Sequence, residues 1–178
     1  VLVSGPTALP APAGVALVPV TSAAEMLAAV EANIDGADLF LAVAAVADYT
    51  PARPSARKIK KGSEAMRLDL EPTVDILARV AGRPGAPFCV GFAAESGKVA
   101  EYAEAKRKRK NVPMIVANLV QQAIGRDDNE VVIHDDAGRH PLPRAAKTRV
   151  AAAILAHATG LMQARPGRAA VRPLKKVS

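Results

Sequence analysis

Short apolar segments alternate along this chain with segments of helical spacing, and this alternation constrains the fold more than any other feature of the sequence. Apolar runs of strand length occur at residues 1–3, 16–20, 39–46, 88–92 and 114–117. Helical spacing of apolar residues occurs at residues 22–36, 73–81, 99–110 and 145–163. Strands that alternate with helices predict an α/β fold of the Rossmann-like, doubly wound type, with a mainly parallel sheet and helices on both faces.

Local signals predict where several of these elements begin and end. Ser22 and Glu25 form a capping box, in which each side chain bonds an amide of the first helical turn, and this helix is expected to end near Gly36. Thr73 is predicted to cap the short helix that follows it. The run at residues 39–46 is apolar throughout, so we expect a strand that is covered by helices on both faces.

The remaining patterns complete the predicted domain. Residues 66–70 alternate between apolar and polar types, which predicts a half-buried strand. Residues 130–134 and 140–142 flank an Asp-Asp-Ala-Gly turn and predict a small C-terminal hairpin. The domain is therefore expected to span residues 1–163. Residues 164–178 contain five basic and no acidic residues, interrupted by proline and glycine, so we expect a basic, disordered tail.

Composition narrows the class of protein further. Half of the residues are hydrophobic, but only 3% are aromatic and tryptophan is absent, so aliphatic side chains must fill the core. The single cysteine, Cys89, excludes an internal disulfide and is compatible with a reducing cytosol. No apolar run reaches the roughly 18 residues that a membrane helix needs, and the first strand has no signal-peptide pattern. We therefore expect a cytoplasmic protein without a membrane partner.

The common catalytic fingerprints are missing from the sequence. It has neither a glycine-rich phosphate loop of the Walker type nor a Gly-x-Gly-x-x-Gly turn after a strand. The three histidines, His134, His140 and His157, lack metal-ligand spacing, and the two on the hairpin are expected to be exposed. Cys89 lies within a buried strand without a basic neighbour, so we expect it to pack rather than to react.

Small and charged residues gather at the predicted strand ends, where doubly wound sheets bind their ligands. The strand at residues 39–46 is followed by Asp48. Lys58 lies on the next loop, which is basic and bounded by prolines, and such a loop can close over an anion. Lys106 and Lys110 are four residues apart on a predicted helix, so they share a face and suit a common anion such as a triphosphate. Each feature alone also fits a turn or a solvated charge run.

Together these segments resemble the phosphopantothenoylcysteine synthetase family, the C-terminal ligase domain of bacterial phosphopantothenoylcysteine decarboxylase/synthetase. The resemblance rests on residues 3–6 (Val-Ser-Gly-Pro), 44–49 (Ala-Ala-Val-Ala-Asp-Tyr), 58–61 (Lys-Ile-Lys-Lys), 91–95 (Gly-Phe-Ala-Ala-Glu) and 102–118. It covers nearly the whole chain up to about Gln163. The order of the segments is more specific than any one of them.

The resemblance implies a CTP-dependent phosphopantothenate–cysteine ligase of coenzyme A biosynthesis. Such a ligase activates 4'-phosphopantothenate as an acyl-cytidylate, which the amine of L-cysteine then attacks, and Mg²⁺ is expected with the triphosphate. Its metal ligands stay unknown. Lys58 is implied as the catalytic lysine that stabilises charge at the acyl centre, and as part of the nucleotide site. The other implied nucleotide-binding residues are Ala42, Val43, Ala44, Asp48, Val74, Asp75, Ile76, Leu77, Phe92, Lys106 and Lys110.

Two departures from the family pattern affect these expectations. The family has Asn-Pro-Asp-Ile where this chain has Thr73-Val74-Asp75-Ile76, so the contacts of residues 74–77 are expected to come from the backbone. The resemblance also implies a strand and a glycine-rich segment ahead of Val1, so this chain alone is expected to bind CTP but to be a poor or inactive ligase. FMN belongs to the decarboxylase domain that is often fused ahead of the ligase and is not expected here. The family further implies a homodimer.

Two other functions stay open on the residues alone. A truncated NADP-dependent oxidoreductase would share the layers, and Tyr102 and Lys106 have a Tyr-x-x-x-Lys spacing, but we expect Tyr102 to pack on the apolar face of its helix. A nucleic-acid-binding module would use the basic residues 106–110 and the tail, but few aromatic residues are present to stack on bases, so nucleic acid is not an expected partner. Titration with NADP, or a salt-dependent affinity for nucleic acid, separates these functions from the ligase.

Overall fold

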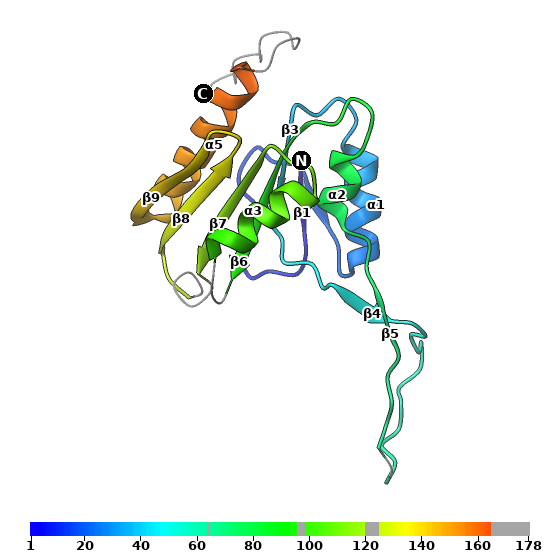
Figure 1. The fold of residues 1–178 in the computed structure, drawn as a ribbon. Helices are drawn as coiled ribbons and strands as arrows, with labels where there is room; N and C mark the ends of the chain where they lie inside the picture. Colours follow the sequence, from blue (N-terminus) through cyan, green and yellow to red (C-terminus); the bar gives the residue numbers. More distant parts are fainter. Residues whose placement is uncertain (64, 96–98, 120–124, 165–178) are drawn as a thin grey trace.

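The computed structural model describes residues 1–63, 65–95, 99–119 and 125–164 (Figure 1). Its strands are β1 (Leu2–Ser4), β2 (Leu17–Pro19), β3 (Leu39–Ala42), β4 (Tyr49–Pro51), β5 (Leu70–Pro72), β6 (Phe88–Glu95), β7 (Met114–Leu119), β8 (Asp128–Asp135) and β9 (Gly138–Ala146). Its helices are α1 (Ala23–Asn33), α2 (Ile76–Ala81), α3 (Val99–Arg109) and α5 (Lys147–Ala164). The predicted tail at residues 164–178 lies outside the described residues, apart from Ala164 at the end of α5.

A five-stranded sheet with the order β3-β6-β7-β8-β9 forms the centre of the fold. β3, β6 and β7 run parallel, with Phe40 opposite Cys89 and Gly91 opposite Ile115. β8 and β9 complete the sheet as an antiparallel hairpin, which confirms the predicted hairpin. β1 and β2 form a separate parallel pair, and β4 and β5 form an antiparallel pair. The α/β class and the parallel arrangement of the central strands are thus as predicted.

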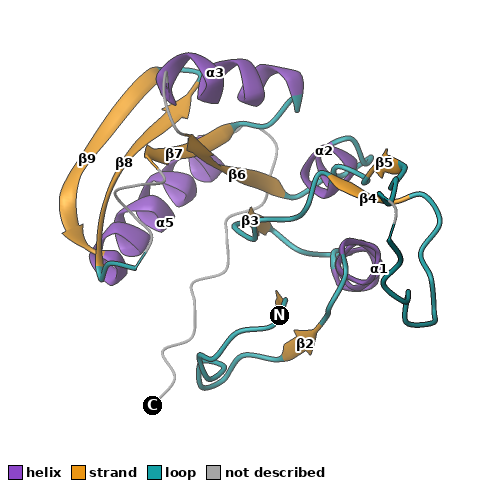
Figure 2. Ribbon diagram, turned by 90° about the horizontal axis from the view of Figure 1, so that it is seen from below, coloured by secondary structure: helices purple, strands orange, loops and turns teal. Residues whose placement is uncertain are grey.

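Helices cover both faces of this sheet, because successive side chains of a strand point to opposite faces. In β6, Cys89 and Ala93 pack in the core cluster formed with α1, α2 and α3. Phe88 and Val90, which alternate with them, pack in a second cluster against α5. Figure 2 shows β6 to β9 between α3 and α5. The continuous apolar run at residues 88–92 is therefore explained by burial on both faces.

The starts of α1 and α2 differ from the sequence-based expectation. Ser22 caps α1 by accepting a bond from the Glu25 amide, but Glu25 accepts its own bond from the amide of Thr21 at 2.6 Å. In a standard capping box Glu25 would accept this bond from the amide of the N-cap residue Ser22, so the donor here is one residue earlier. The prediction that Thr73 caps α2 is wrong: Asp75 is the N-cap and accepts a bond from the Ala78 amide. Two residues with cap chemistry, Thr73 and Asp75, precede this helix, and the Thr73 hydroxyl is engaged by the Ala47 carbonyl.

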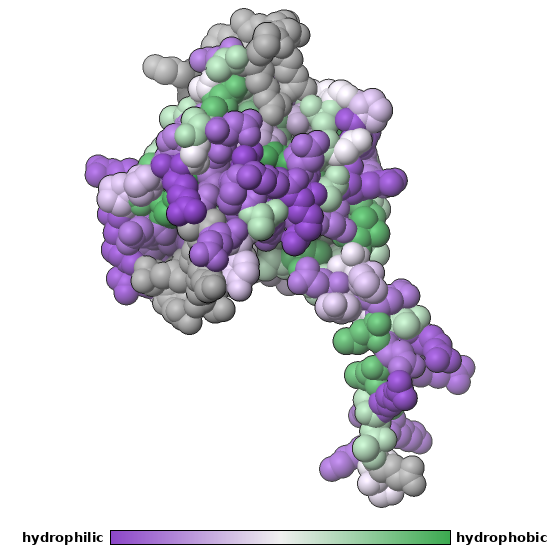
Figure 3. Space-filling model, in the orientation of Figure 1, coloured by the Kyte–Doolittle hydropathy of each residue, from purple (hydrophilic) through white to green (hydrophobic). Residues whose placement is uncertain are grey.

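The described residues between β4 and β5, 52–63 and 65–69, form an arm that projects from the body (Figure 1). The predicted strand at residues 66–70 is wrong in its bounds, because β5 begins only at Leu70. Met66 and Leu68 are 63% and 59% exposed. Figure 3 shows hydrophilic and hydrophobic residues side by side on this arm. The alternation at residues 66–70 resembled a half-buried strand, but no sheet face lies against it in the described part of the chain.

The strand predicted at residues 39–46 is shorter and less buried than expected. β3 ends at Ala42, Leu41 is 37% exposed and Val43 is 61% exposed. β3 pairs with β6 along one edge, and among the described strands its other edge has no partner. None of the described helices is both long enough and apolar enough to cross a membrane.

Candidate functional site

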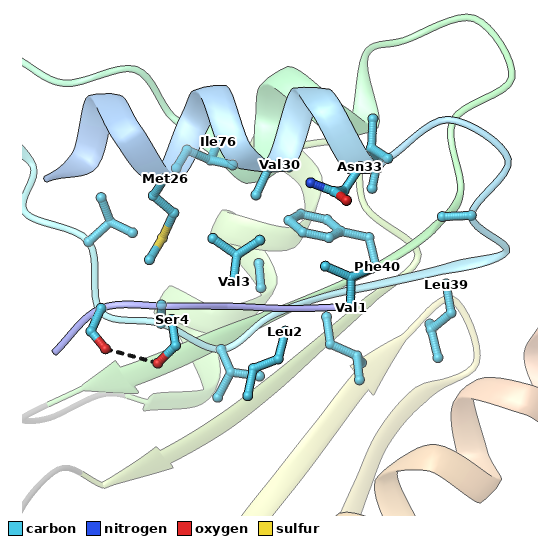
Figure 4. A pocket seen from close by; sticks show the side chains of 18 residues that line it. Val1, Leu2, Val3, Ser4, Met26, Val30, Asn33, Leu39, Phe40 and Ile76 are labelled. Carbon is cyan, nitrogen blue, oxygen red and sulfur yellow. Dashed lines mark hydrogen bonds between the residues drawn. The ribbon is translucent and has the colours of Figure 1, made fainter. Parts of the chain in front are cut away.

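The carboxyl end of β3 lies beside the middle of β6, because Ala42 pairs with Gly91 in the parallel register and β6 continues to Glu95. The residues after Ala42 leave the sheet and line a cavity of about 650 Å³. β1 and α1 form other parts of its wall (Figure 4). Of the predicted nucleotide-binding residues, Ala42, Val43, Ala44 and Ile76 line this cavity.

Apolar side chains make up most of the cavity wall. Val3, Met26 and Val30 surround it in the close-up of Figure 4. The Asn33 side chain is also in the wall, but its amide donates to the Ala29 carbonyl at 2.8 Å. Among the described strands, β1 pairs only with β2, and β3 pairs only with β6. Each of the strands β1 and β3 therefore has one unpaired edge, and both strands line this wall. The cavity therefore offers van der Waals surface and backbone polar groups, which suits a flat ring better than a phosphate.

The segment before α2 holds Asp48 at the same edge of the sheet. The amide of Thr73 donates to the Asp48 carbonyl at 2.9 Å, and its hydroxyl donates to the Ala47 carbonyl at 2.5 Å. The side chains of Asp48 and Val74 are exposed. The structure thus brings Asp48 next to the residues that open α2, through contacts such as the one between Ala47 and Thr73, which are 26 positions apart in sequence.

The first turn of α2 packs directly on β6. Ile76 and Leu77 are both buried in the core cluster, and Ile76 also lines the cavity. Gly91 lies against Leu77: a Cβ atom at Gly91 would stand 2.5 Å from Leu77 Cδ2. The absence of a side chain at Gly91 therefore allows α2 to approach the strand.

Two lysines of the basic helix reach α2 and β6. Lys106 Nζ donates to the Phe92 carbonyl at 3.1 Å. Lys110 Nζ lies 2.8 and 2.9 Å from the two carboxylate oxygens of Asp75. The Lys110 amide bonds the Lys106 carbonyl at 3.0 Å, so the two residues stand one helical turn apart. The predicted common face is confirmed, and it is turned towards the carboxyl end of β6 and the start of α2.

Asp75 offsets part of this positive charge. Burial raises the pKa of Asp75, but hydrogen bonds from Lys110 and from the Ala78 amide, together with the Lys110 charge, outweigh it and hold the pKa below the ordinary value. The carboxylate is therefore ionised at neutral pH, and an anion that approaches Lys110 competes with it. Sequence reasoning named both residues but missed their ion pair, because they are 35 residues apart.

Lys58 is the one predicted site residue that lies apart from the others. It belongs to the exposed arm, which projects away from the sheet (Figure 1). In the part of the chain that the structure describes, the exposed Lys58 side chain makes no hydrogen bond or ion pair. The structure brings Lys106 and Lys110 together, and the convergence of Lys58 with them stays a prediction that requires the arm to close.

The histidines differ most from the sequence-based expectation. His134 is fully buried rather than exposed, and burial is the main cause that lowers its pKa below the ordinary value. His140 of β9 and His157 of α5 place their Nε2 atoms 3.0 and 2.7 Å from the two carboxylate oxygens of Asp135. Sequence spacing gave no sign of this cluster, because the hairpin and the helix meet only in the folded chain.

Three other residues of the sequence analysis are also placed by the structure. Cys89 is buried and its thiol donates to the Pro87 carbonyl at 3.5 Å, as expected of a packing cysteine. Tyr102, expected to pack on the apolar face of its helix, is instead 53% exposed. Arg107 is buried, although its helix was predicted to be basic on its exposed side. Its guanidinium lies 3.0 Å from the Glu104 carboxylate and 2.7 Å from the Asp136 carboxylate. The Arg107 ion pairs explain why a charged residue is tolerated there.

Comparison with known proteins gives a consistent family. Residues 1–161 match the family model described as the DNA/pantothenate metabolism flavoprotein C-terminal domain. The coenzyme A biosynthesis bifunctional protein CoaBC of Vibrio cholerae is 40% identical over 160 residues, a match that covers 86% of this chain and 40% of that protein. This chain thus spans about two fifths of the length of the curated relative.

Solved structures agree with this match. The C-terminal domain of a CoaBC protein superposes with a TM-score of 0.75 at 36% identity, over 92% of this chain and 74% of that one. A Cab2 variant in complex with phosphopantothenate-cysteine superposes with a TM-score of 0.69 over 83% of this chain and 52% of that one, but its 18% identity shows the fold alone. The chain therefore belongs to the family of the DNA/pantothenate metabolism flavoprotein C-terminal domain, together with the C-terminal domain of CoaBC.

Proposed function

We propose that this chain forms the nucleotide-binding part of a CTP-dependent phosphopantothenate–cysteine ligase of coenzyme A biosynthesis. The family match over residues 1–161 carries the proposal, because the relatives in this family include coenzyme A biosynthesis proteins. The fold relative that holds phosphopantothenate-cysteine agrees with a ligase that joins these two parts. The reaction converts 4'-phosphopantothenate to an acyl-cytidylate with release of pyrophosphate, and the amine of L-cysteine then displaces CMP.

The residues at the sheet edge divide into two groups by their chemistry. Ala42, Val43 and Ala44 leave β3 with small side chains at the rim of the cavity, so a cytidine ring can approach their backbone closely. Asp48 adds an exposed carboxylate on the same side, which can accept bonds from the nucleoside. The backbone of residues 74–77 completes this group.

The residues assigned to the phosphates are Lys106 in α3 and Lys110, which directly follows α3. Lys106 and Lys110 present two ammonium groups, one beside the Phe92 carbonyl and one beside Asp75. Triphosphate oxygens are stronger partners for ammonium groups than a backbone carbonyl, because the bonds are charge-assisted on both sides. CTP arrives as its Mg²⁺ complex, and the ion belongs to the substrate. Closure of the arm then brings Lys58 to the acyl centre, where it stabilises developing negative charge.

Calorimetric titration of the full chain with MgCTP tests this proposal. We expect saturable binding, with MgATP weaker, since the cavity rim is assigned to cytidine. Lys106→Ala and Lys110→Ala each remove one ammonium-to-phosphate bond, worth about 1.5–3 kcal/mol, so each is expected to weaken binding by about ten- to a hundredfold. Binding is the proper readout, because the chain spans only part of the length of its relatives.

Lys108 provides the matched control on the same helix. The Lys108 side chain is 73% exposed, and its ammonium lies 3.5 Å from the Glu104 carboxylate. Lys108→Ala removes the same charge and is expected to change the CTP affinity by less than about threefold. The proposal fails if a folded chain shows no heat with CTP, or if Lys108→Ala weakens binding as much as Lys106→Ala and Lys110→Ala do.

A further inference from the structure

A cluster of one carboxylate and two imidazoles lies where the hairpin meets the last helix. Asp135 ends β8, His140 lies near the start of β9, and His157 lies in α5. The carboxylate oxygen Oδ1 of Asp135 is 3.0 Å from His140 Nε2, and Oδ2 is 2.7 Å from His157 Nε2. The two imidazole rings are 4.7 Å apart between centroids. Two residues of the hairpin and one residue of α5 therefore bring their ligand atoms together, with the two imidazoles on different oxygens of the Asp135 carboxylate.

The geometry of the cluster is close to that of a bound metal ion. All three ligand atoms lie within 4.8 Å of one another. Zinc binds imidazole nitrogen and carboxylate oxygen at about 2.0–2.2 Å, so two ligands of one tetrahedral ion stand about 3.3–3.6 Å apart. His140 lies 3.0 Å from Asp135 Oδ1 and His157 lies 2.7 Å from Asp135 Oδ2, which are hydrogen-bond distances and shorter than this separation. To accept an ion, the imidazoles therefore have to give up these hydrogen bonds and move away from the carboxylate by roughly 0.3–0.6 Å.

The surroundings of Asp135 fix the carboxylate and leave access from one side. Oδ1 accepts bonds from the amides of Ala137 at 2.8 Å and Gly138 at 3.1 Å, which hold the group in place. The Asp135 side chain is 2% exposed, whereas His140 is 37% and His157 is 24% exposed. A rigid carboxylate below two accessible imidazoles is a favourable arrangement for capturing an ion from solvent.

We propose that Asp135, His140 and His157 form a binding site for a divalent transition-metal ion of the zinc class. Three protein ligands of this kind leave a fourth position of a tetrahedral site to water. A neutral imidazole gives up the proton at Nε2 and takes one up at Nδ1, so binding needs a change of tautomer and no net loss of protons. The bound ion joins the β8–β9 hairpin to α5.

This site is separate from the proposed nucleotide site. β8 runs antiparallel to β7, and His134 pairs with Ile115 near the start of β7. Asp135 therefore lies at the amino ends of the parallel strands, whereas Phe92 and Ala42 lie towards their carboxyl ends. The ion consequently has a structural effect on the hairpin and helix, and it takes no part in binding the triphosphate.

Titration of the metal-free, full-length chain with Co²⁺ and Zn²⁺ tests the proposal without any nucleotide. We expect one ion per chain, a visible absorption band of tetrahedral Co²⁺, and a melting temperature that rises with Zn²⁺ concentration. His140→Ala and His157→Ala each remove one ligand and are expected to weaken Zn²⁺ binding by at least about tenfold. Cys89 and His134 are both buried and do not compete for the ion.

Arg139→Ala is the matched control, because Arg139 is exposed and adjacent to His140 but contributes no ligand atom. It is expected to bind Zn²⁺ within twofold of the wild type. Circular dichroism establishes that each variant is folded, and His140→Ala, at the more exposed imidazole, provides the decisive variant if His157→Ala unfolds. Absence of saturable Zn²⁺ and Co²⁺ binding to the folded wild type overturns the proposal, and so does unchanged affinity in folded His140→Ala. The cluster is then a hydrogen-bonded tie between the hairpin and α5.

Discussion

Replacing Gly91 by alanine tests how closely α2 is packed on β6. The backbone of Gly91 is not among the described residues with positive φ, so alanine is allowed there by conformation. Its Cβ atom, however, would stand 2.5 Å from both Leu77 Cδ2 and Ile115 Cδ1. Carbon atoms in contact are normally about 3.5–4.0 Å apart, so each neighbour has to retreat by about 1 Å. Leu77 and Ile115 are both buried in the core cluster formed with α1, α2 and α3.

The expected cost follows from two opposing terms. Overpacking a filled core destabilises by roughly 1–3 kcal/mol. Replacing glycine by alanine reduces the freedom of the unfolded chain, which stabilises by about 0.4–1 kcal/mol. Both clashing atoms are ends of side chains that can rotate, so the lower part of the first range applies. We expect Gly91→Ala to lower the free energy of unfolding by about 1 kcal/mol, which corresponds to about 2–4 °C in Tm for a chain of this size.

Urea and thermal unfolding, followed by circular dichroism, measure this change. Gly160→Ala in α5 is the control, because a Cβ atom there meets nothing within 4 Å. Alanine in an open helical position is expected to raise the stability by about 0.5–1 kcal/mol. Ile115→Val removes the clashing Cδ1 atom, so the double variant with Gly91→Ala is expected to recover at least about 0.5 kcal/mol relative to additivity.

Two outcomes would refute this reasoning. If the Gly91→Ala variant is as stable as the wild type while Gly160→Ala is neutral or stabilising, the space beside Gly91 is larger than described. Strict additivity of Gly91→Ala and Ile115→Val would mean that Ile115 does not contact this position.

Two further predictions concern buried titratable and charged groups. The pKa of His134 is lowered in the folded chain, so the folded chain keeps this imidazole neutral at a pH at which the unfolded chain takes up a proton. The free energy of unfolding is therefore expected to fall as the pH falls from about 6.5, by at most about 1.4 kcal/mol per pH unit. Urea unfolding across pH should show a shallower dependence for His134→Leu, and an unchanged dependence contradicts the assignment. Arg107→Met removes the partner of Glu104 and Asp136, and because both carboxylates are partly exposed we expect a loss of only about 1–2 kcal/mol in urea unfolding. Lys108→Met, at an exposed position, should change stability by less than about 0.5 kcal/mol, and an equal loss in the two variants would contradict the role of Arg107.

The buried elements were predictable because their patterns are local. The apolar runs at residues 88–92 and 114–117 specified β6 and β7, since a strand covered on both faces needs apolar residues at every position. The spacing of Lys106 and Lys110 correctly predicted one helical face. Helix period and strand period are properties of a few neighbouring residues, so a single sequence carries them.

The errors arose where tertiary contacts decide the outcome. Thr73 and Asp75 are both good caps, and the contact of Thr73 with the Ala47 carbonyl leaves Asp75 to begin α2. His134 was expected on an exposed hairpin, but α3 and β7 cover that part of β8. The site itself was predicted as a set of residues through the family resemblance. The Asp75–Lys110 ion pair was not predicted, because nothing local connects the two residues.

In the described residues of the arm, the hydrogen bonds that fasten it to the body lie at its base. The Ala52 amide bonds the Asp69 carbonyl at 2.9 Å, and the Thr73 amide bonds the Asp48 carbonyl at 2.9 Å. Because the entropy of closing a loop grows with the logarithm of its length, doubling the arm would cost the fold only about 0.6 kcal/mol. Insertions, deletions and charge changes in this segment are therefore nearly invisible to selection for stability. Evolution can thus adjust the reach of the arm without re-engineering the domain that carries it.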